Sequence, residues 1–319
     1  MKRKICFINH GLSTGGPTTF VLNAIRGLDK EKYDFSVIMA VDSHNSKQFF
    51  QEEAAALGAH IYCAGDLDDI RKKLRYFKNL YGFLKTTGPY DVVHGNMDLF
   101  NGILLFAARL TGVKTRICHS HTTNSQYEIE TKKHISVNLY RYFMRKMIWI
   151  NSTLRLGCSV DAMEYLYKGK WRDNSRSFVL YNGFPLDKFA KVEGNQTATA
   201  EKLGIEPNRK YIITVGNISE VKNPIFTAEV MAEMIKLDSA FRLIWIGGGE
   251  LLDQVKKRVE DLGISAYIRF MGVRKDVNDF LKCCDAFLLP SLFEGLSIAL
   301  VEAQAAGLDC FVSDTITRE

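Results

Sequence analysis

The sequence predicts an α/β protein of two domains, each built on a doubly wound parallel sheet. Its 319 residues are many for one hydrophobic core and suit two domains of about 150 residues. Short apolar runs alternate with segments of helical periodicity along the chain. Several of these runs end in a glycine loop before a helix, and the same strand–loop–helix unit recurs in the second half.

In the first half, short apolar runs predict strands over Ile5–Ile8, Phe35–Ala40, Ala59–Cys63, Asp91–His94, Val113–Cys118 and Leu154–Ser159. Helical spacing of apolar residues predicts helices over Thr18–Leu28, Lys47–Leu57, Asp69–Lys85, Leu99–Leu110, Ser136–Asn151 and Asp161–Tyr167. Leu154–Ser159 is expected to be the last strand of this half. The predicted first domain therefore spans residues 1–180.

The second half repeats the pattern over residues 181–319, the predicted second domain. Its predicted strands are Tyr211–Val215, Leu243–Ile246, Ile268–Met271 and Ala286–Leu289. Its predicted helices are Phe226–Ile235, Leu251–Asp261, Val277–Cys283 and Ser297–Ala306. The turn Asn182-Gly183 and the polar segment 191–199 are typical of a surface linker between the two domains.

The composition is that of an ordinary globular protein, with 46% hydrophobic and 24% charged residues. The apolar run Ile5–Ile8 is too short for a signal-peptide core, and no run approaches the roughly 18 to 20 residues of a membrane span. The seven cysteines are scattered without C-x-x-C spacing, which favours reduced thiols over a zinc site or a disulfide framework. These features predict a cytoplasmic protein.

Positive charge is concentrated in the first half. Residues 1–180 contain 26 lysines and arginines and 16 acidic residues, whereas residues 181–319 contain 16 and 20. This asymmetry indicates an anionic partner, either a phosphate-bearing substrate or an anionic membrane surface. The helix Asp69–Lys85 has a basic side that could lie on lipid, although an outer helix packed on the sheet explains it too. Aromatics beside arginines in Ser136–Asn151 are explained by core packing behind a basic outer face, so nucleic acid is not an expected partner.

Two loops of the first half carry candidate site residues. Gly15-Gly16 follows the first strand, where glycine lets backbone approach a ligand closely or simply forms a tight turn. His119-Ser120-His121 follows the strand Val113–Cys118, and ligands gather at the carboxyl ends of such strands. No acidic or cysteine residue at a suitable spacing accompanies the histidines, so no metal site is predicted.

The most informative stretch runs from Pro290 to Gly307, PSLFEGLSIALVEAQAAG. It predicts a short loop between a buried strand and the start of a helix, which is an anion site because the first helical N–H groups have no partner within the helix. Glu294 lies in this loop, and Glu302 lies in the apolar helix with seven residues between them. A carboxylate in an apolar helix needs a partner, which need not be protein.

This run of residues, with its Glu-x7-Glu spacing, resembles the signature of the retaining nucleotide-sugar glycosyltransferases of the GT-B fold, family four. The resemblance extends over nearly the whole chain. It implies two Rossmann-like domains facing across a cleft, the second of which binds the sugar nucleotide. The chain stops earlier than family members, which continue through further strands and a final helix, so it resembles a C-terminally short member.

The resemblance also implies roles for individual residues. A histidine at the end of the strand Val113–Cys118 contacts the donor sugar; His121 is preferred, and His119 remains an alternative. Lys222 matches a lysine that clamps the donor diphosphate, whereas Asn217 stands where an arginine is usual. Glu294 holds hydroxyls of the transferred sugar and Glu302 those of the ribose. The other implied donor-binding residues are Gly15, Gly16, Gly248, Val273, Arg274, Gly295, Leu296, Ser297 and Ile298.

The implied function is transfer of a sugar, with retention, from a nucleoside diphosphate-sugar to a saccharide or lipid-linked saccharide in polysaccharide assembly, such as that of a capsule or exopolysaccharide. A UDP-sugar is the expected donor, and neither a metal nor a further cofactor is expected. The protein would act in the cytoplasm, at most peripherally on the inner face of the plasma membrane. Two alternatives remain: a nucleotide-sugar epimerase on the same fold, and a degenerate member that binds nucleotide without catalysis.

Overall fold

The computed structural model describes residues 2–13, 15–40, 48–67, 70–122, 135–183, 185, 189, 196–316 and 318–319. The chain divides into two compact units, Met1–Gly183 together with Glu319, and Phe184–Arg318. The predicted boundary lay between residues 180 and 181. Of the predicted linker, residues 191–195 lie outside the described residues, and residues 196–199 begin a helix.

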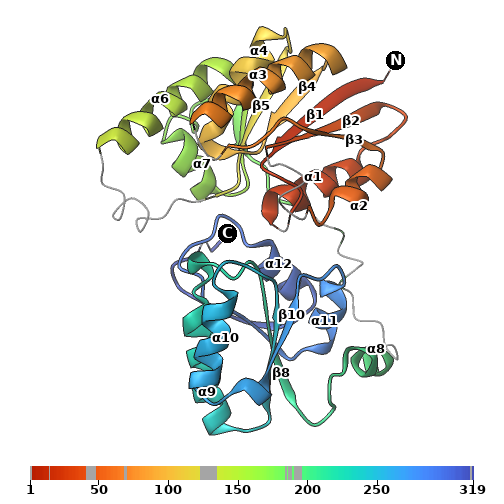
Figure 1. The fold of residues 1–319 in the computed structure, drawn as a ribbon, viewed down its shortest axis with the longest axis vertical. Helices are drawn as coiled ribbons and strands as arrows, with labels where there is room; N and C mark the ends of the chain where they lie inside the picture. The colour runs from red at the N-terminus through yellow and green to blue at the C-terminus, as the bar shows by residue number, and fades with distance from the viewer. Residues whose placement is uncertain are drawn as a thin grey trace. The chain divides into compact units, whose positions relative to one another are not determined.

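The first unit contains a sheet of parallel strands in the order β3-β2-β1-β4-β5-β6-β7 (Figure 1). The strands are β1 (Arg3–Asn9), β2 (Tyr33–Met39), β3 (Ala59–Cys63), β4 (Val92–Gly95), β5 (Thr115–Ser120), β6 (Leu154–Gly157) and β7 (Ser177–Val179). The prediction that the run after Leu154 forms the last strand of this half is wrong, because β7 pairs with β6. A strand of three residues is too short to show a period in the sequence.

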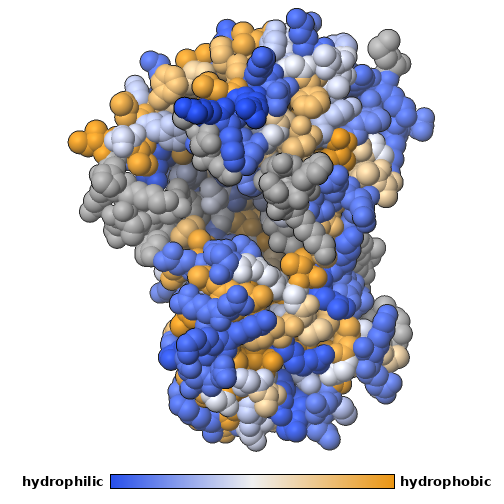
Figure 2. Space-filling view, viewed as in Figure 1, coloured by the Kyte–Doolittle hydropathy of each residue, from blue (hydrophilic) through white to orange (hydrophobic). Residues whose placement is uncertain are grey.

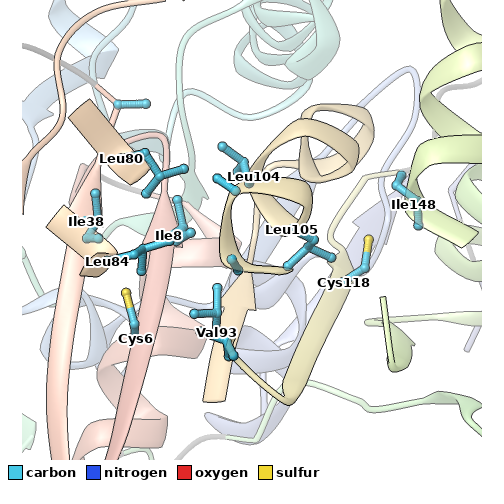
Figure 3. Close-up of a cluster of buried hydrophobic side chains, with 14 of the residues drawn as sticks. Cys6, Ile8, Ile38, Leu80, Leu84, Val93, Leu104, Leu105, Cys118 and Ile148 are labelled. Atoms are coloured by element: carbon cyan, nitrogen blue, oxygen red, sulfur yellow. The ribbon is translucent and has the colours of Figure 1, made fainter. Parts of the chain in front are cut away.

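Helices cover both faces of this sheet, which is why its strands are apolar almost throughout. The helices are α1 (Gly16–Gly27), α2 (Gln51–Ala56), α3 (Ile70–Thr87), η1 (Asp98–Phe100), α4 (Asn101–Leu110), α6 (Ile135–Asn151) and α7 (Val160–Tyr167). On one face Ile25 of α1 belongs to a buried cluster with Val37 of β2. On the other, Leu80 of α3 and Leu104 of α4 are buried with Ile8 of β1 (Figure 3).

The outer surface of α3, α4 and α6 is basic and partly apolar. α4 packs between the other two helices. The three carry ten lysines and arginines, six in α3, one in α4 and three in α6, and no acidic residue. Figure 2 shows hydrophobic atoms over α6 and hydrophilic atoms over α3. The large exposed apolar side chains of α6 are Ile135, Leu139, Tyr140, Tyr142, Phe143 and Ile150. None of the described helices is both long and apolar enough to cross a membrane.

The predicted orientation of α6 is therefore wrong. Arg141, expected on a basic outer face, is buried with Met144 and Ile148, and these residues repeat at helical spacing along the inner side. Tyr142 and Phe143, expected in the core, are 66% and 56% exposed. Because apolar residues occupy nearly the whole circumference of this helix, its sequence does not reveal which side faces the sheet.

The second unit contains a parallel sheet in the order β10-β9-β8-β11-β12. Its strands are β8 (Lys210–Val215), β9 (Phe241–Ile246), β10 (Ile268–Gly272), β11 (Ala286–Leu289) and β12 (Asp309–Val312), the last of which was not predicted. Its helices are α8 (Gln196–Leu203), η3 (Glu220–Lys222), α9 (Pro224–Leu237), α10 (Leu252–Asp261), η4 (Ser265–Tyr267), α11 (Val277–Cys283) and α12 (Ile298–Ala305). Two buried clusters, one on each face, hold these helices to the sheet.

Both sheets have a topological switch point beside their first strand. β1 lies between β2 and β4, and β8 lies between β9 and β11. The connections from these central strands diverge to opposite sides, and a doubly wound sheet binds ligands at the carboxyl ends of the strands where they diverge. Each unit therefore has one expected ligand site, at the ends of β1 and β4 and at the ends of β8 and β11.

Candidate functional site

In the second unit, the loops after β8 and β9 approach each other so closely that glycine is required. A Cβ atom on Gly247 would lie 1.8 Å from the carbonyl oxygen of Gly216, and one on Gly249 would lie 2.3 Å from that of Ile218. The N–H of Ile218 donates to the carbonyl of Gly248 at 2.9 Å. The two loops thus meet backbone against backbone beside the switch point, with the side chains of Asn217, Lys222 and Val273 next to their glycines.

The loops after β8 and β11 are joined by an ion pair at the same switch point. Nζ of Lys222, the last residue of η3, pairs with Oε1 of Glu294. The two side chains are only 23% and 12% exposed. The N–H of Leu292 donates to the carbonyl of Val221 at 2.8 Å and ties the two loops together. The structure therefore brings together two residues predicted to bind the donor. Asn217, predicted beside them, is exposed.

The start of α12 lies beside Glu294 in the chain and has unpaired helical N–H groups. Ser297 caps the helix, and its hydroxyl accepts a hydrogen bond from the N–H of Leu300 at 3.4 Å. The N–H groups of the first helical residues, beginning at Ile298, have no acceptor within the helix. Together with the ammonium of Lys222, they can bind an anion such as a diphosphate. Glu302, one turn further along the helix, is half-buried.

Gly248 and Val273 lie at the carboxyl ends of two further strands of the second sheet, β9 and β10. A Cβ atom on Gly248 would lie 3.7 Å from Cγ2 of Val273, so the loops after β9 and β10, each implied to bind the donor, are neighbours. Val273 is 37% exposed. Arg274 is held by Asp276, with Nε of Arg274 2.8 Å from Oδ1, and this hydrogen bond lowers the pKa of Asp276. Arg274 is therefore engaged with its own loop.

In the first unit, the predicted histidines lie at the end of β5, close to the switch point. The strand includes His119 and Ser120, two residues beyond its predicted end, and His121 follows. The ring centroids of His119 and His121 lie 4.0 Å apart, and Phe20 of α1 meets His119 edge-on at 4.7 Å. Gly15 caps α1 with φ of 137°, a conformation that glycine adopts readily, and Gly16 is the first residue of the helix.

A third histidine, His94 at the end of β4, completes this group. Its Nε2 lies 3.2 Å from Nδ1 of His119. Burial lowers the pKa of His94 and of His121 to about 3, and it lowers that of His119 well below its usual value. All three imidazoles are therefore neutral at pH 7. They can exchange hydrogen bonds with hydroxyl groups but carry no charge to offset a phosphate.

Sequence reasoning missed several polar residues of this unit. Asn9 ends β1, Asn96 follows β4, and Asp98 begins η1. Asn9 and Asn96 are buried, and burial raises the pKa of Asp98 to about 6. Their signal in the sequence was a polar residue directly after an apolar run, the same signal that identified His119. The sequence does not single them out, because the order of the strands, which brings β1, β4 and β5 side by side, is not a local property.

Among the described residues, the structure gives no candidate metal centre. In the ranges that the structure describes, no three histidine, cysteine or carboxylate side chains are arranged to hold a metal ion. His94, His119 and His121 contact one another through rings and hydrogen bonds rather than converging on a common point. The positively charged group predicted to bind the donor diphosphate is Lys222.

Two family profiles together cover most of the chain. The profile described as "Glycosyltransferase Family 4" matches residues 14–188, and the one described as "Glycosyl transferases group 1" matches residues 195–317. The chain is 30% identical to the putative glycosyltransferase EpsF of Bacillus subtilis over 320 residues, which cover 100% of this chain and 81% of EpsF. It is also 30% identical over 293 residues to a UDP-Gal:α-D-GlcNAc-diphosphoundecaprenol α-1,3-galactosyltransferase of Escherichia coli, with coverages of 90% and 73%.

Solved structures share the fold. Anabaena Alr3699/HepE in complex with UDP-glucose superposes with a TM-score of 0.77 at 16% identity, covering 98% of this chain and 80% of that one. WaaG, a glycosyltransferase involved in lipopolysaccharide biosynthesis, gives a TM-score of 0.72 at 17% identity, with coverages of 98% and 81%. The predicted class of two doubly wound domains is thereby confirmed, and the epimerase alternative is not favoured by these relatives.

Proposed function

The chain belongs to the family 4 glycosyltransferases, and from this membership we propose that it transfers a sugar from a UDP-sugar, with retention, to a lipid-linked saccharide. One observation supports the proposed donor-binding site. Lys222, Glu294 and the start of α12 lie at the switch point of the second sheet, where a doubly wound fold binds its ligand. The relatives bound to UDP and UDP-glucose support uridine as the nucleoside.

In this proposal the second unit binds the donor by its diphosphate. Lys222 and the N–H groups of Leu296, Ser297 and Ile298 offset the charge that develops on the leaving diphosphate. No metal ion is then needed, and a chelator should leave turnover unchanged. Asn217 can donate a hydrogen bond but carries no charge, so Lys222 takes most of this role.

The two glutamates have separate roles in binding the donor. Glu302 accepts from the ribose hydroxyls, and Glu294 accepts from hydroxyls of the transferred sugar. Gly248, Val273 and the backbone of Arg274 lie along the base. Because Glu302 is committed to the ribose, the glutamates do not act as the acid and nucleophile of a retaining glycosidase. The leaving phosphate instead helps to deprotonate the acceptor hydroxyl, and His121 contacts the sugar near the carbon that is attacked.

We propose that the acceptor is presented at a membrane. The galactosyltransferase relative acts on a diphosphoundecaprenol-linked sugar, as does an N-acetylgalactosaminyltransferase of Campylobacter jejuni with 22% identity over 207 residues. The surface of this chain that suits an anionic bilayer is the layer α3–α4–α6, which has no acidic residue and ten basic residues, all but the buried Arg141 at least partly exposed. Exposed Leu139 and Phe143 of α6 would enter the headgroup region while the basic side chains contact lipid phosphates.

Nucleotide binding tests the donor site directly. We expect UDP, at a hundredfold excess over its dissociation constant, to add about 2.7 kcal/mol to the free energy of unfolding. GDP, ADP and NAD should add less, and Glu302→Ala should reduce the effect of UDP. Measurements of thermal unfolding with each nucleotide provide the comparison. If no nucleoside diphosphate stabilises the wild-type protein, the proposed donor site is wrong.

Vesicle flotation tests the membrane surface separately. Wild-type protein should float with vesicles that contain about one-third phosphatidylglycerol and remain behind with pure phosphatidylcholine, since the basic layer requires anionic lipid. The double variant Leu139→Glu, Phe143→Glu should lose flotation. Phe226→Glu, on a 48% exposed residue of α9 in the other unit, is the matched control and should float like the wild type. Equal flotation of wild type with both vesicles would exclude the electrostatic part of the proposal.

A further inference from the structure

A chain of buried amides leads to His121. Nε2 of His121 lies 2.9 Å from Oδ1 of Asn96, and Nδ2 of Asn96 donates to Oδ1 of Asn9 at 2.9 Å. Asn9 and Asn96 are 0% and 4% exposed. These contacts come from the ends of β1, β4 and β5, which are adjacent in the sheet. The chain therefore joins the switch point of the first sheet to the imidazole of His121.

The direction of these hydrogen bonds specifies the tautomer of His121. The atom of Asn96 that lies against Nε2 of His121 is the carbonyl oxygen Oδ1, which can only accept, so Nε2 of His121 carries the hydrogen. The imidazole is neutral, so Nδ1 carries a lone pair. Among the described residues, Nδ1 of His121 has no hydrogen-bond partner although it is enclosed by protein. An enclosed acceptor without a donor is costly unless a ligand or water supplies one.

Asp98 holds the backbone of the same residue. Its Oδ1 accepts from the N–H of His121 at 3.1 Å and from the hydroxyl of Ser120 at 3.4 Å. Asp98 adopts φ of 43°, a left-handed conformation that is uncommon for residues other than glycine, although asparagine, aspartate and histidine adopt it more often than the rest. Strained residues of this kind persist where the surrounding contacts require them, often at functional sites. The carboxylate thus fixes the place where His121 leaves β5.

Unpartnered polar atoms accumulate around this chain. In the described part of the molecule, Nε2 of His119 and Nδ2 of Asn9 are also enclosed without a hydrogen-bond partner. Three such atoms in one cluster exceed what a folded domain usually leaves unsatisfied in so small a region. Phe20 packs against the rings of His94, His119 and His121, so the cluster is apolar on that side. These polar atoms therefore have hydrogen-bonding capacity that the described protein does not use.

We infer that Asn96, supported by Asn9 and Asp98, is a positioning residue that holds His121 as its Nε2–H tautomer and leaves Nδ1 to accept a hydrogen bond from a sugar hydroxyl. The hydroxyl part rests on the proposed function, because it assumes that a sugar reaches His121. The bond from Nε2–H to Asn96 rests on the geometry, and the lone pair on Nδ1 rests on the burial that keeps the imidazole neutral. Among the residues that the structure describes, the other titratable groups that face His121 are His94, His119 and Asp98.

Nuclear magnetic resonance of protein with ¹³C,¹⁵N-labelled histidine tests the tautomer without any substrate. We expect the ring nitrogens of His121, assigned by comparison with His121→Gln, to show a protonated Nε2 and an unprotonated Nδ1 at pH 7. In Asn96→Leu this preference should be lost. Asn151→Leu replaces an amide that is equally buried but bonds within α6, and it should leave the His121 signals unchanged. A protonated Nδ1 in the wild type, or no change in Asn96→Leu, overturns the inference.

Kinetics then separate the positioning role from the proposed function. Asn96→Leu should lower kcat about tenfold, which corresponds to one lost hydrogen bond in the transition state, and leave the Kd of UDP unchanged. Asn96→Asp is the second variant, in case Asn96→Leu does not fold. Its carboxylate should favour the imidazolium of His121, so kcat should fall as pH is lowered through the raised pKa. If the tautomer changes as expected but kcat does not, the hydroxyl contact is excluded, while the positioning of His121 stands.

Discussion

Nζ of Lys222 pairs with Oε1 of Glu294 across the carboxyl ends of β8 and β11, although the two residues lie 72 positions apart in the sequence. In the proposed complex, Lys222 binds the diphosphate and Glu294 binds the sugar. The ion pair keeps both side chains at the switch point without donor. When donor binds, phosphate oxygens must compete with Glu294 for the ammonium, so the two residues are coupled.

Removing Lys222 should weaken nucleotide binding. We expect Lys222→Ala to raise the Kd of UDP by ten- to a hundredfold, because a hydrogen bond to a charged group contributes about 1.5–3 kcal/mol. Isothermal titration calorimetry measures this change. Lys236→Ala is the matched control, since Lys236 is 69% exposed on α9 and pairs only with its helix neighbour Glu233 among the contacts described. An unchanged Kd in Lys222→Ala would contradict the role of this lysine.

Neutralising Glu294 should affect binding and turnover in opposite directions. In Glu294→Gln the ammonium of Lys222 no longer has a carboxylate partner, so we expect UDP to bind a few-fold more tightly. Turnover with the sugar donor should fall at least tenfold, because a hydrogen-bond acceptor for the sugar is weakened. Calorimetry with UDP and steady-state kinetics test the two halves. Weaker binding of UDP would show that Glu294 does not compete with phosphate.

Substitutions in the glycine loop should separate folding from binding. Gly247→Ala places a Cβ atom 1.8 Å from the carbonyl oxygen of Gly216 in a residue with φ of 140°, so we expect it to lower the free energy of unfolding by about 2–4 kcal/mol. Gly248→Ala meets only Val273, at 3.7 Å, and should cost less than about 1 kcal/mol. Urea unfolding measures both. Equal destabilisation of the two variants would contradict the close approach of the loops.

The buried histidines should make the protein sensitive to acid. The pKa of His94 is lowered to about 3, so the unfolded chain binds a proton below pH 6.5 that the folded chain does not. The stability that depends on neutral His94 is therefore present above pH 6.5 and is lost as pH falls towards 3. As pH falls below 6.5, the free energy of unfolding of His94→Gln should fall less steeply than that of the wild type. We expect the two slopes to differ by about 1.4 kcal/mol per pH unit. Urea unfolding at pH 7, 6 and 5 tests this.

Two comparisons make the acid experiment decisive. His60→Gln, which removes a histidine whose side chain is 61% exposed, is the matched control for His94→Gln. Asp98 acts in the opposite direction: burial raises its pKa to about 6, so its contribution is present below pH 4 and is lost as pH rises through 6. This contribution is common to the wild type and to His94→Gln. Parallel pH curves for these two proteins would show that His94 is not held neutral.

Many elements of the fold could be predicted because they depend on local patterns. The strands Ala59–Cys63 and Ala286–Leu289 and the helix Val277–Cys283 have the predicted bounds. The short β7 and β12 were missed, since too few residues carry the pattern. The prediction of the exposed face of α6 was wrong, because apolar residues surround that helix and its contacts with α4 and η1 decide which side is buried.

The sequence by itself determined the repeated strand–loop–helix units, the glycine loops and the residues that carry the family resemblance, because each depends on neighbours in the chain. Only the tertiary structure decided that Asn9, Asn96 and His121 form one hydrogen-bonded chain and that Lys222 meets Glu294. The physical reason is the order of the strands. Each sheet places its first strand beside its fourth, and this pairing depends on the packing of helices on both faces rather than on any local period.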